Sequence, residues 1–275
     1  MRSASRAEVR APFGRVVGAL MRRDFQITRS YRAPFVLDIF FGIMNLVVFY
    51  YISQAVSVER GDLGGATTYF AFASVGSMLT VVVQSATAGL ATRVREEQLT
   101  GTLEMLVMQP VSTLHLPFGL TGFPFLFGFV RVALYVAFAG IFLDLGLADA
   151  SWLGFLSILI AAALALSGLG IVLGAIVLVF KQGTTLAVVL MFGFGLLSGA
   201  LFPRDLLPGW VETLGYLLPT RFALDGLRNA LFAGGGWQDD FLALITTALV
   251  LLPLSVWFFA AMLRVVKRSG SLSQY

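Results

Sequence analysis

The densest group of charged side chains in this sequence lies between Arg93 and Pro110, in the stretch RVREEQLTGTLEMLVMQP. Guanidinium and carboxylate groups at this spacing form ion pairs, cap helix ends or bind a charged partner. None of them can lie in hydrocarbon without a large penalty, so the stretch must lie in water. Its apolar residues recur at spacings of three and four, which predicts a short helix with one apolar face.

Residues for covalent or metal chemistry are scarce. The chain has no cysteine and a single histidine, His115, which excludes thiolate chemistry and a histidine-cluster metal site within this chain. The sequence also lacks a phosphate-binding Gly-x-x-x-x-Gly-Lys-Ser/Thr loop, a His-Glu-x-x-His motif and a Gly-x-Ser-x-Gly elbow. We therefore expect no metal site, and any ATP must be bound by a partner.

Arg131 is a charged residue within a long apolar run. A charge placed there is costly and marks a functional site by default. It is a candidate for the translocation pathway, where a guanidinium would attract an anionic head group or phosphate. The alternatives are that Arg131 pairs with Asp38 or a backbone carbonyl, or extends toward the membrane surface.

The overall composition identifies an integral membrane protein. Of 275 residues, 58% are hydrophobic and 12% are charged, whereas roughly 25% are charged in a soluble domain. The net charge of +4 is explained by basic loops on the inner side of a membrane, so lipid and not nucleic acid is the expected environment.

Three regions follow from the pattern along the chain. Residues 1–33 are basic, and from Phe13 onward they predict an amphipathic helix in the membrane interface, with a disordered tail as the alternative. Residues 34–263 form an all-α transmembrane domain, and residues 264–275 are a polar tail. The six apolar runs expected to span the bilayer are 34–53, 68–91, 117–143, 152–180, 184–202 and 241–263.

The segment between the last two runs is irregular. Prolines interrupt its helical periodicity, which favours short helices dipping into the outer leaflet over a further span. We interpret the spacing of Arg221, Asp225 and Arg228 as intrahelical ion pairing. The residues that define this segment are Pro203, Pro208, Trp210, Pro219 and Arg228.

The distribution of basic residues predicts the orientation. With the N-terminus inside, fourteen Lys and Arg residues lie on the inner side and four on the outer side. By the positive-inside rule both termini are cytoplasmic, and the charged stretch is a cytoplasmic segment between spans two and three.

Two motifs resemble the ABC-2 type permeases, the membrane subunits of bacterial ABC exporters. Residues 97–112, EQLTGTLEMLVMQPVS, resemble the cytoplasmic coupling segment of that family. Residues 198–203 (SGALFP), 207–210 (LPGW) and 218–228 (LPTRFALDGLR) resemble its second signature. The chain differs from the family pattern at residues 117–128, which are unusually rich in Pro, Gly and Phe.

The resemblance implies a transport subunit without an ATPase site of its own. It would move an amphipathic, lipid or glycan substrate, such as a polysaccharide or a drug, across the bacterial inner membrane. Two permease chains, identical or similar, would pair with two ATP-binding subunits. This chain would bind no cofactor, since ATP and Mg would be held by the partner.

The resemblance also assigns roles to the charged stretch. The N-terminal amphipathic helix becomes the elbow helix, residues 96–108 the coupling helix, and residues 206–218 and 222–232 the re-entrant outer helices. Leu103 and Leu106 are expected to pack, Glu97 and Glu104 to form ion pairs or caps, and Gly101 to allow close backbone approach. The full set expected to contact the ATP-binding partner is Glu96, Glu97, Gly101, Thr102, Leu103, Glu104 and Leu106.

Two other classes were weighed against this interpretation. A secondary transporter or channel predicts an inverted repeat with paired charges at the midplane, and neither a clear repeat nor a charge beyond Arg131 is visible. A membrane-embedded lipid-modifying enzyme needs clustered acidic or histidine side chains, whereas the acidic residues here are scattered.

Overall fold

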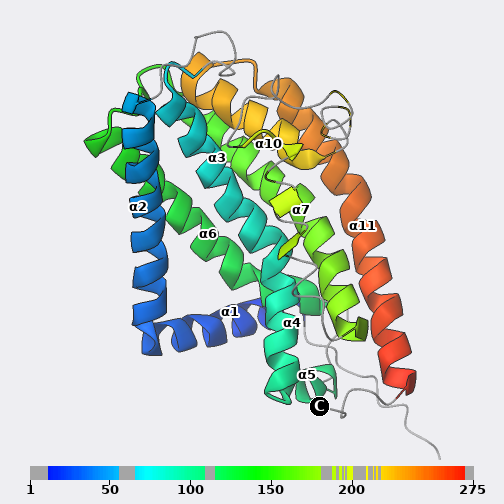
Figure 1. Ribbon diagram of the computed structural model, residues 1–275. Coiled ribbons are helices and arrows are strands. Elements are labelled where there is room, and N and C mark those ends of the chain that lie inside the picture. The colour runs from blue at the N-terminus through cyan, green and yellow to red at the C-terminus, as the bar shows by residue number, and fades with distance from the viewer. Residues whose placement is uncertain are drawn as a thin grey trace, which may run out of the picture.

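The computed structural model describes residues 12–55, 66–108, 115–180 and 218–269, with positions 188–189, 192–193, 195, 197–200, 209, 213 and 215. In these ranges every regular element is a helix (Figure 1). Five described helices are long and apolar enough to cross a membrane, namely Arg32–Ala55, Tyr69–Leu99, His115–Phe142, Trp152–Val179 and Gln238–Val266. Most of the predicted span 184–202 lies outside the described residues, as do Pro203, Pro208 and Trp210, so the count of six stays a prediction.

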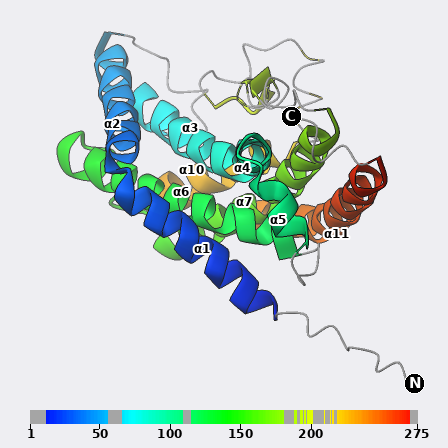
Figure 2. The same cartoon turned by 90° about the horizontal axis from the view of Figure 1, so that it is seen from below.

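Helix α1 (Phe13–Ser30) lies across one end of the bundle, and α2 (Arg32–Ala55) rises from it along the side (Figures 1 and 2). The two helices separate at Tyr31, whose φ of −115° and ψ of 71° are not helical. Val16 and Leu20 on the apolar face of α1 are buried. At α6, Gly119 leaves room for Leu20, because a Cβ on Gly119 would lie 2.3 Å from Leu20 Cδ1.

The second span is one continuous helix made of α3 (Tyr69–Val83), a π-helical turn η1 (Gln84–Ala88) and α4 (Gly89–Leu99). The sequence prediction ended this span at residue 91. The helix continues because Arg93, Arg95 and Glu96 are good helix formers that keep the backbone helical after the apolar run ends. The charged stretch is therefore first an extension of a transmembrane helix.

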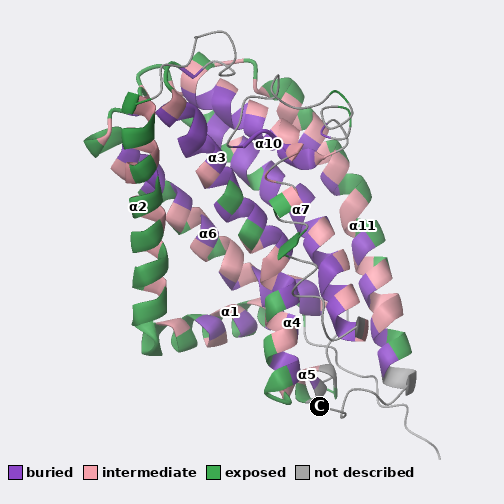
Figure 3. Ribbon diagram, in the orientation of Figure 1, coloured by how far each residue is buried: buried purple, intermediate pink, exposed green. Residues whose placement is uncertain are grey.

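The centre of the bundle is the contact of this second span with α7 (Trp152–Phe180) (Figure 3). In the most apolar part of the second span 78% of residues are buried, against 6% in α2. Two glycines permit close approach of backbones. A Cβ on Gly170 would lie 1.9 Å from the Ala86 carbonyl oxygen, and a Cβ on Gly76 would lie 1.9 Å from the Ala200 carbonyl oxygen. The helix-packing role predicted for small residues in span two is thus confirmed.

The remaining helices surround this centre. α6 (His115–Phe142) crosses behind α2, and α11 (Gln238–Ser269) packs along α7 (Figure 1). Each contains a proline, Pro124 in α6 and Pro253 in α11.

At the end opposite α1 lies α10 (Pro219–Arg228), which continues into the π-helical turn η3 (Asn229–Ala233) (Figure 1). Pro219 begins the helix, where its missing N–H and fixed φ are favourable. This helix begins three residues before the predicted range 222–232. The turn ends at Gly234, whose φ of 64° suits glycine.

Candidate functional site

The charged stretch forms a corner at the end of the bundle that carries α1. Helix α4 ends at Leu99, and a turn at Thr100 and Gly101 leads into the short helix α5 (Thr102–Met108). The single helix predicted over residues 96–108 is therefore wrong. The chain turns between two helices instead, and the Gly101 amide donates a hydrogen bond to the Gln98 carbonyl at 3.1 Å.

Gly101 makes this turn possible. Its φ of 69° lies in the left-handed region, which costs an L-residue other than Asn or Asp roughly 1–2 kcal/mol. A Cβ on Gly101 would meet nothing within 4 Å. The close backbone approach predicted for this glycine concerns the ATP-binding partner and stays a prediction. Within the described residues, Gly101 has a conformational role in the turn.

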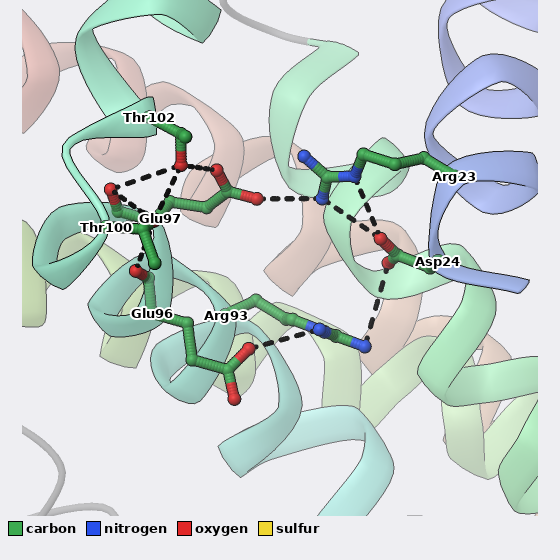
Figure 4. A network of polar contacts seen from close by, with 7 residues as sticks. All are labelled: Arg23, Asp24, Arg93, Glu96, Glu97, Thr100 and Thr102. Atoms are coloured by element: carbon green, nitrogen blue, oxygen red, sulfur yellow. Dashed lines mark hydrogen bonds and ion pairs between the residues drawn. The ribbon is translucent and has the colours of Figure 1, made fainter. Parts of the chain in front are cut away.

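A network of ion pairs joins the corner to α1 (Figure 4). The Arg23 guanidinium lies 2.7 Å from a Glu97 carboxylate oxygen and 3.0 Å from Asp24. Arg93 lies 3.1 Å from Glu96 and 3.8 Å from Asp24. The ion pair predicted for Glu97 is present, and its partner comes from a helix more than seventy positions earlier in the chain.

Two threonines tie the same network to the turn. The Thr102 hydroxyl donates to the second carboxylate oxygen of Glu97. The Thr100 hydroxyl donates to the Glu96 carbonyl at 2.8 Å, and the two hydroxyl oxygens lie 2.8 Å apart. Glu97 thus connects α1, the end of α4 and the start of α5 (Figure 4).

The network is largely withdrawn from water, since the side chain of Asp24 is fully buried and that of Glu97 is 10% exposed. Burial alone would lower the pKa of Arg23, but attraction to Glu97 and Asp24 and its hydrogen bonds to both outweigh burial. The pKa of Arg23 is therefore raised above its ordinary value, and this guanidinium stays charged at any physiological pH.

The apolar residues of the corner divide into two groups. Leu103 is buried in a cluster with Leu90 and Val94, and Leu106 is half-buried against the same cluster. Three others are open to solvent: Leu99 is 65% exposed, Met105 68% and Met108 80%. Leu103 and Leu106 thus pack within this chain. The uncovered apolar surface is formed by Leu99, Met105 and Met108. The Glu104 side chain lies outside the described residues.

Arg23 and Asp24 were not among the predicted site residues. A signal for Asp24 was available, because it follows Val16 and Leu20 at intervals of four, which places a carboxylate on the apolar face of α1. A charge at such a position requires a buried partner. Nothing local in the sequence indicated which partner it would be.

Arg131 lies apart from this network, in the middle of α6. Its guanidinium is 2.8 Å from the Asp38 carboxylate in α2, and its second terminal nitrogen donates to the Tyr135 hydroxyl at 3.4 Å. Gly42 allows α2 to approach, since a Cβ there would lie 1.6 Å from the Tyr135 hydroxyl oxygen. The pairing with Asp38 raised as an alternative is therefore present.

Comparison with known families gives one match, in which the family model of the ABC-2 type transporters covers residues 15–232. The chain belongs to the ABC-2 type transporter family. The match begins in α1, includes the whole ion-pair network and ends in η3. No curated protein gives a significant match.

Membership of the ABC-2 family confirms the resemblance seen in the two sequence motifs. It makes the chain a membrane subunit of a transporter, of the kind that works with an ABC ATP-binding partner. The second motif includes α10, where Arg228 is buried. Its guanidinium stacks on the Phe72 ring of α3, 3.7 Å from the centroid, and donates to the Gly199 carbonyl at 3.2 Å.

The turn of this ABC-2 chain provides a first testable prediction. Gly101→Val is expected to destabilise the corner by roughly 1–2 kcal/mol, because a β-branched residue is strained at positive φ. Gly101→Asn is the matched control, since asparagine adopts this conformation readily. Proteolysis between α4 and α5 in detergent measures the effect, and equal cleavage of both variants would contradict the conformational role.

Proposed function

We propose that this chain is the permease subunit of an ATP-driven exporter, and that a separate ATP-binding subunit docks on the corner formed by α4 and α5. The supporting observation is the corner itself. It presents an uncovered apolar surface of Leu99, Met105 and Met108. The ion pairs of Arg23 with Glu97 and Asp24 hold the corner against α1. An exposed apolar surface rimmed by polar residues is typical of a protein interface.

The corner also has a direct path into the membrane. Helix α4 continues through η1 into α3 without a break, and the ion pairs of Glu97 and Arg93 join it to α1, from which α2 rises. Closure of an ATP-bound partner would therefore move two elements together. In this mechanism Glu97, Gly101 and Thr102 hold the shape of the corner, and Glu96 adds an exposed pair with Arg93. Glu104 lies on the short helix that enters the partner.

We also propose a subunit composition and a membrane location for the transporter. Two permease chains, identical or similar, pair with two ATP-binding subunits, which hold ATP and Mg. The positive-inside rule supports a bacterial inner-membrane location with both termini in the cytoplasm. The cargo belongs to the amphipathic class, such as lipids, glycans or drugs, and reaches the outer side past α10. The re-entrant helices predicted around Pro203, Pro208 and Trp210 stay a prediction.

Co-purification tests the docking surface. The chain is co-expressed with candidate ABC ATP-binding subunits of the same organism, and the one that co-purifies is used as the partner. Met105→Lys with Met108→Lys is expected to reduce the recovered partner and its ATPase activity at least tenfold, because two charges would enter an apolar contact. The control Thr92→Lys places a charge on an exposed position of α4 outside this surface. Full recovery of partner and activity in the double variant would refute the proposal.

A further inference from the structure

A cavity of about 220 Å³ opens between α2, α6 and the second span. It lies toward the end of the bundle that carries α1, because Asp38 follows the start of α2 by only six residues, roughly 9 Å along the helix axis. At about 30 Å³ for each water in the liquid, its volume is that of roughly seven waters. That is the size of a small polar head group.

The lining of the cavity includes charged and polar side chains. Asp38 comes from α2, Arg131 from α6, and Gln84, Ser85 and Arg93 from the second span. The Asp38 carboxylate is 47% exposed even though it is paired with Arg131. The Nε atom of Arg131 is buried and has no hydrogen-bond partner among the described residues, and an unsatisfied buried donor of this kind is unusual in a native structure.

The lining of the cavity also includes three phenylalanine rings. Phe35 of α2 meets the edge of Phe127 with ring centroids 5.0 Å apart, and Phe127 stacks on Phe123 at 6.3 Å. This combination suits a molecule with a polar end and an apolar tail. Such molecules are supplied by the leaflet in which a cavity at this depth lies.

The charges of the cavity are closely balanced. Arg131 is matched by Asp38, and Arg93 is matched by Asp24 and Glu96 outside the lining. A ligand with a single charge would have to compete with one of these partners. A ligand carrying both signs can contact the exposed carboxylate and the arginines at once, so each of its charges finds an opposite charge.

We propose that this cavity binds the zwitterionic head group of an amphiphile from the inner leaflet. Its phosphate or carboxylate accepts hydrogen bonds from Arg131 and Arg93, its amine contacts Asp38, and its tail begins along Phe123 and Phe127. Binding does not depend on the proposed ATP-binding partner. Arg93 also contacts Asp24 in the corner network, so communication with that partner does rest on the function proposed above.

Photolabelling of the full chain in dodecyl maltoside tests this site. The probe is a phosphatidylethanolamine with a photoactivatable group at the start of its tail, and the labelled peptides are mapped. Labelling is expected on α2 and α6 around Phe35 and Phe127. Lysophosphatidylethanolamine should displace the probe at least tenfold better than lysophosphatidylglycerol, which has only the negative charge, or dodecyltrimethylammonium, which has only the positive one.

Three variants assign the contacts. Asp38→Asn should reduce displacement of the probe by lysophosphatidylethanolamine to the level of lysophosphatidylglycerol. Arg131→Gln should weaken displacement by both lysolipids about tenfold. Phe127→Trp should abolish labelling by filling the cavity. Arg264→Gln, at an exposed site on α11, is the matched control and should change nothing. If Arg131→Gln fails to fold, the Asp38 and Phe127 variants decide.

Two results would overturn the proposal. Equal displacement by the anionic and zwitterionic lysolipids would make this a simple anion site. Labelling spread over the exposed faces of α2 and α11, and unchanged by Phe127→Trp, would indicate general contact with lipid.

Discussion

Replacing Glu97 with arginine is expected to reduce the ATPase activity of the assembled transporter more than tenfold. The new guanidinium would face that of Arg23, which now lies 2.7 Å from Glu97, and Thr102 would lose its acceptor. Because the Arg23 side chain is 34% exposed, the cost of losing this ion pair lies between the roughly 1 kcal/mol of an exposed pair and the roughly 3–5 kcal/mol of a fully buried one. The two like charges would add repulsion and weaken the contact of α1 with the corner. ATP hydrolysis by the purified complex in lipid nanodiscs measures the effect.

A neighbouring glutamate provides the control. Glu96→Arg changes the same charge one residue earlier, but the Glu96 side chain is half exposed, and exposed pairs contribute at most about 1 kcal/mol. A double-mutant cycle with Arg23→Gln and Glu97→Gln should give a coupling energy of roughly 1–3 kcal/mol. A value near zero, or full activity of Glu97→Arg, would show that α1 and the corner act independently.

The second large effect is expected at the opposite end of the bundle. Arg228→Leu should lower the thermal stability of the chain in detergent, because Arg228 is only 1% exposed and both its ring contact and its carbonyl contact are lost. A desolvated cation–π contact is worth about 2 kcal/mol, and a hydrogen bond from a charged group about 1.5–3 kcal/mol. We expect a Tm lower by roughly 7–20 °C, at about 2–4 °C for each kcal/mol.

Two further substitutions separate stacking from charge alone. Arg228→Lys keeps the charge but loses the planar group that lies over the Phe72 ring, so it should recover less than half of the lost Tm. Arg264→Leu, on the exposed face of α11, should leave Tm within about 2 °C, since exposed substitutions change stability by at most about 0.5 kcal/mol. A Tm for Arg228→Leu equal to that of Arg264→Leu would contradict the anchoring role.

Hydrophobic runs were enough to place the five described helices that are long and apolar enough to cross a membrane. The run beginning at Trp152 and ending at Phe180 became α7 with the same bounds, and α2 begins two residues before its prediction. This success has a simple cause, because a helix in hydrocarbon must satisfy its backbone internally and needs about twenty apolar residues. Length and composition then determine the element.

The polar contacts were not predictable in the same way. The spacing of Arg221, Asp225 and Arg228 predicted local ion pairs. The pair of Arg221 with Asp225 is present at 4.0 Å, whereas the Arg228 guanidinium turns into the core and lies over the Phe72 ring. The spacing of Asp24 from Val16 and Leu20 placed its carboxylate on the apolar face of α1. The spacing did not predict its contact with Arg93, because that contact joins helices distant in sequence. Periodicity describes one helix at a time, whereas buried charges are satisfied between helices.

The break at Gly101 had a weak signal in the sequence, because Thr100, Gly101 and Thr102 all have low helix propensity. The strong helix formers and the apolar period on either side nevertheless predicted one helix over residues 96–108, and the residue with positive φ ends it. The exposed surface of the corner depends on that break, because it turns Met105 and Met108 outward and Leu103 inward.

The continuous second span has a mechanical consequence. Its 31 residues measure about 46 Å, whereas the hydrocarbon of a bilayer is about 30 Å thick. One of the two closest backbone contacts on this helix is near its middle, where Gly170 of α7 meets the carbonyl of Ala86. A tilt of the helix about this contact would move the corner and the opposite end of the helix in opposite directions.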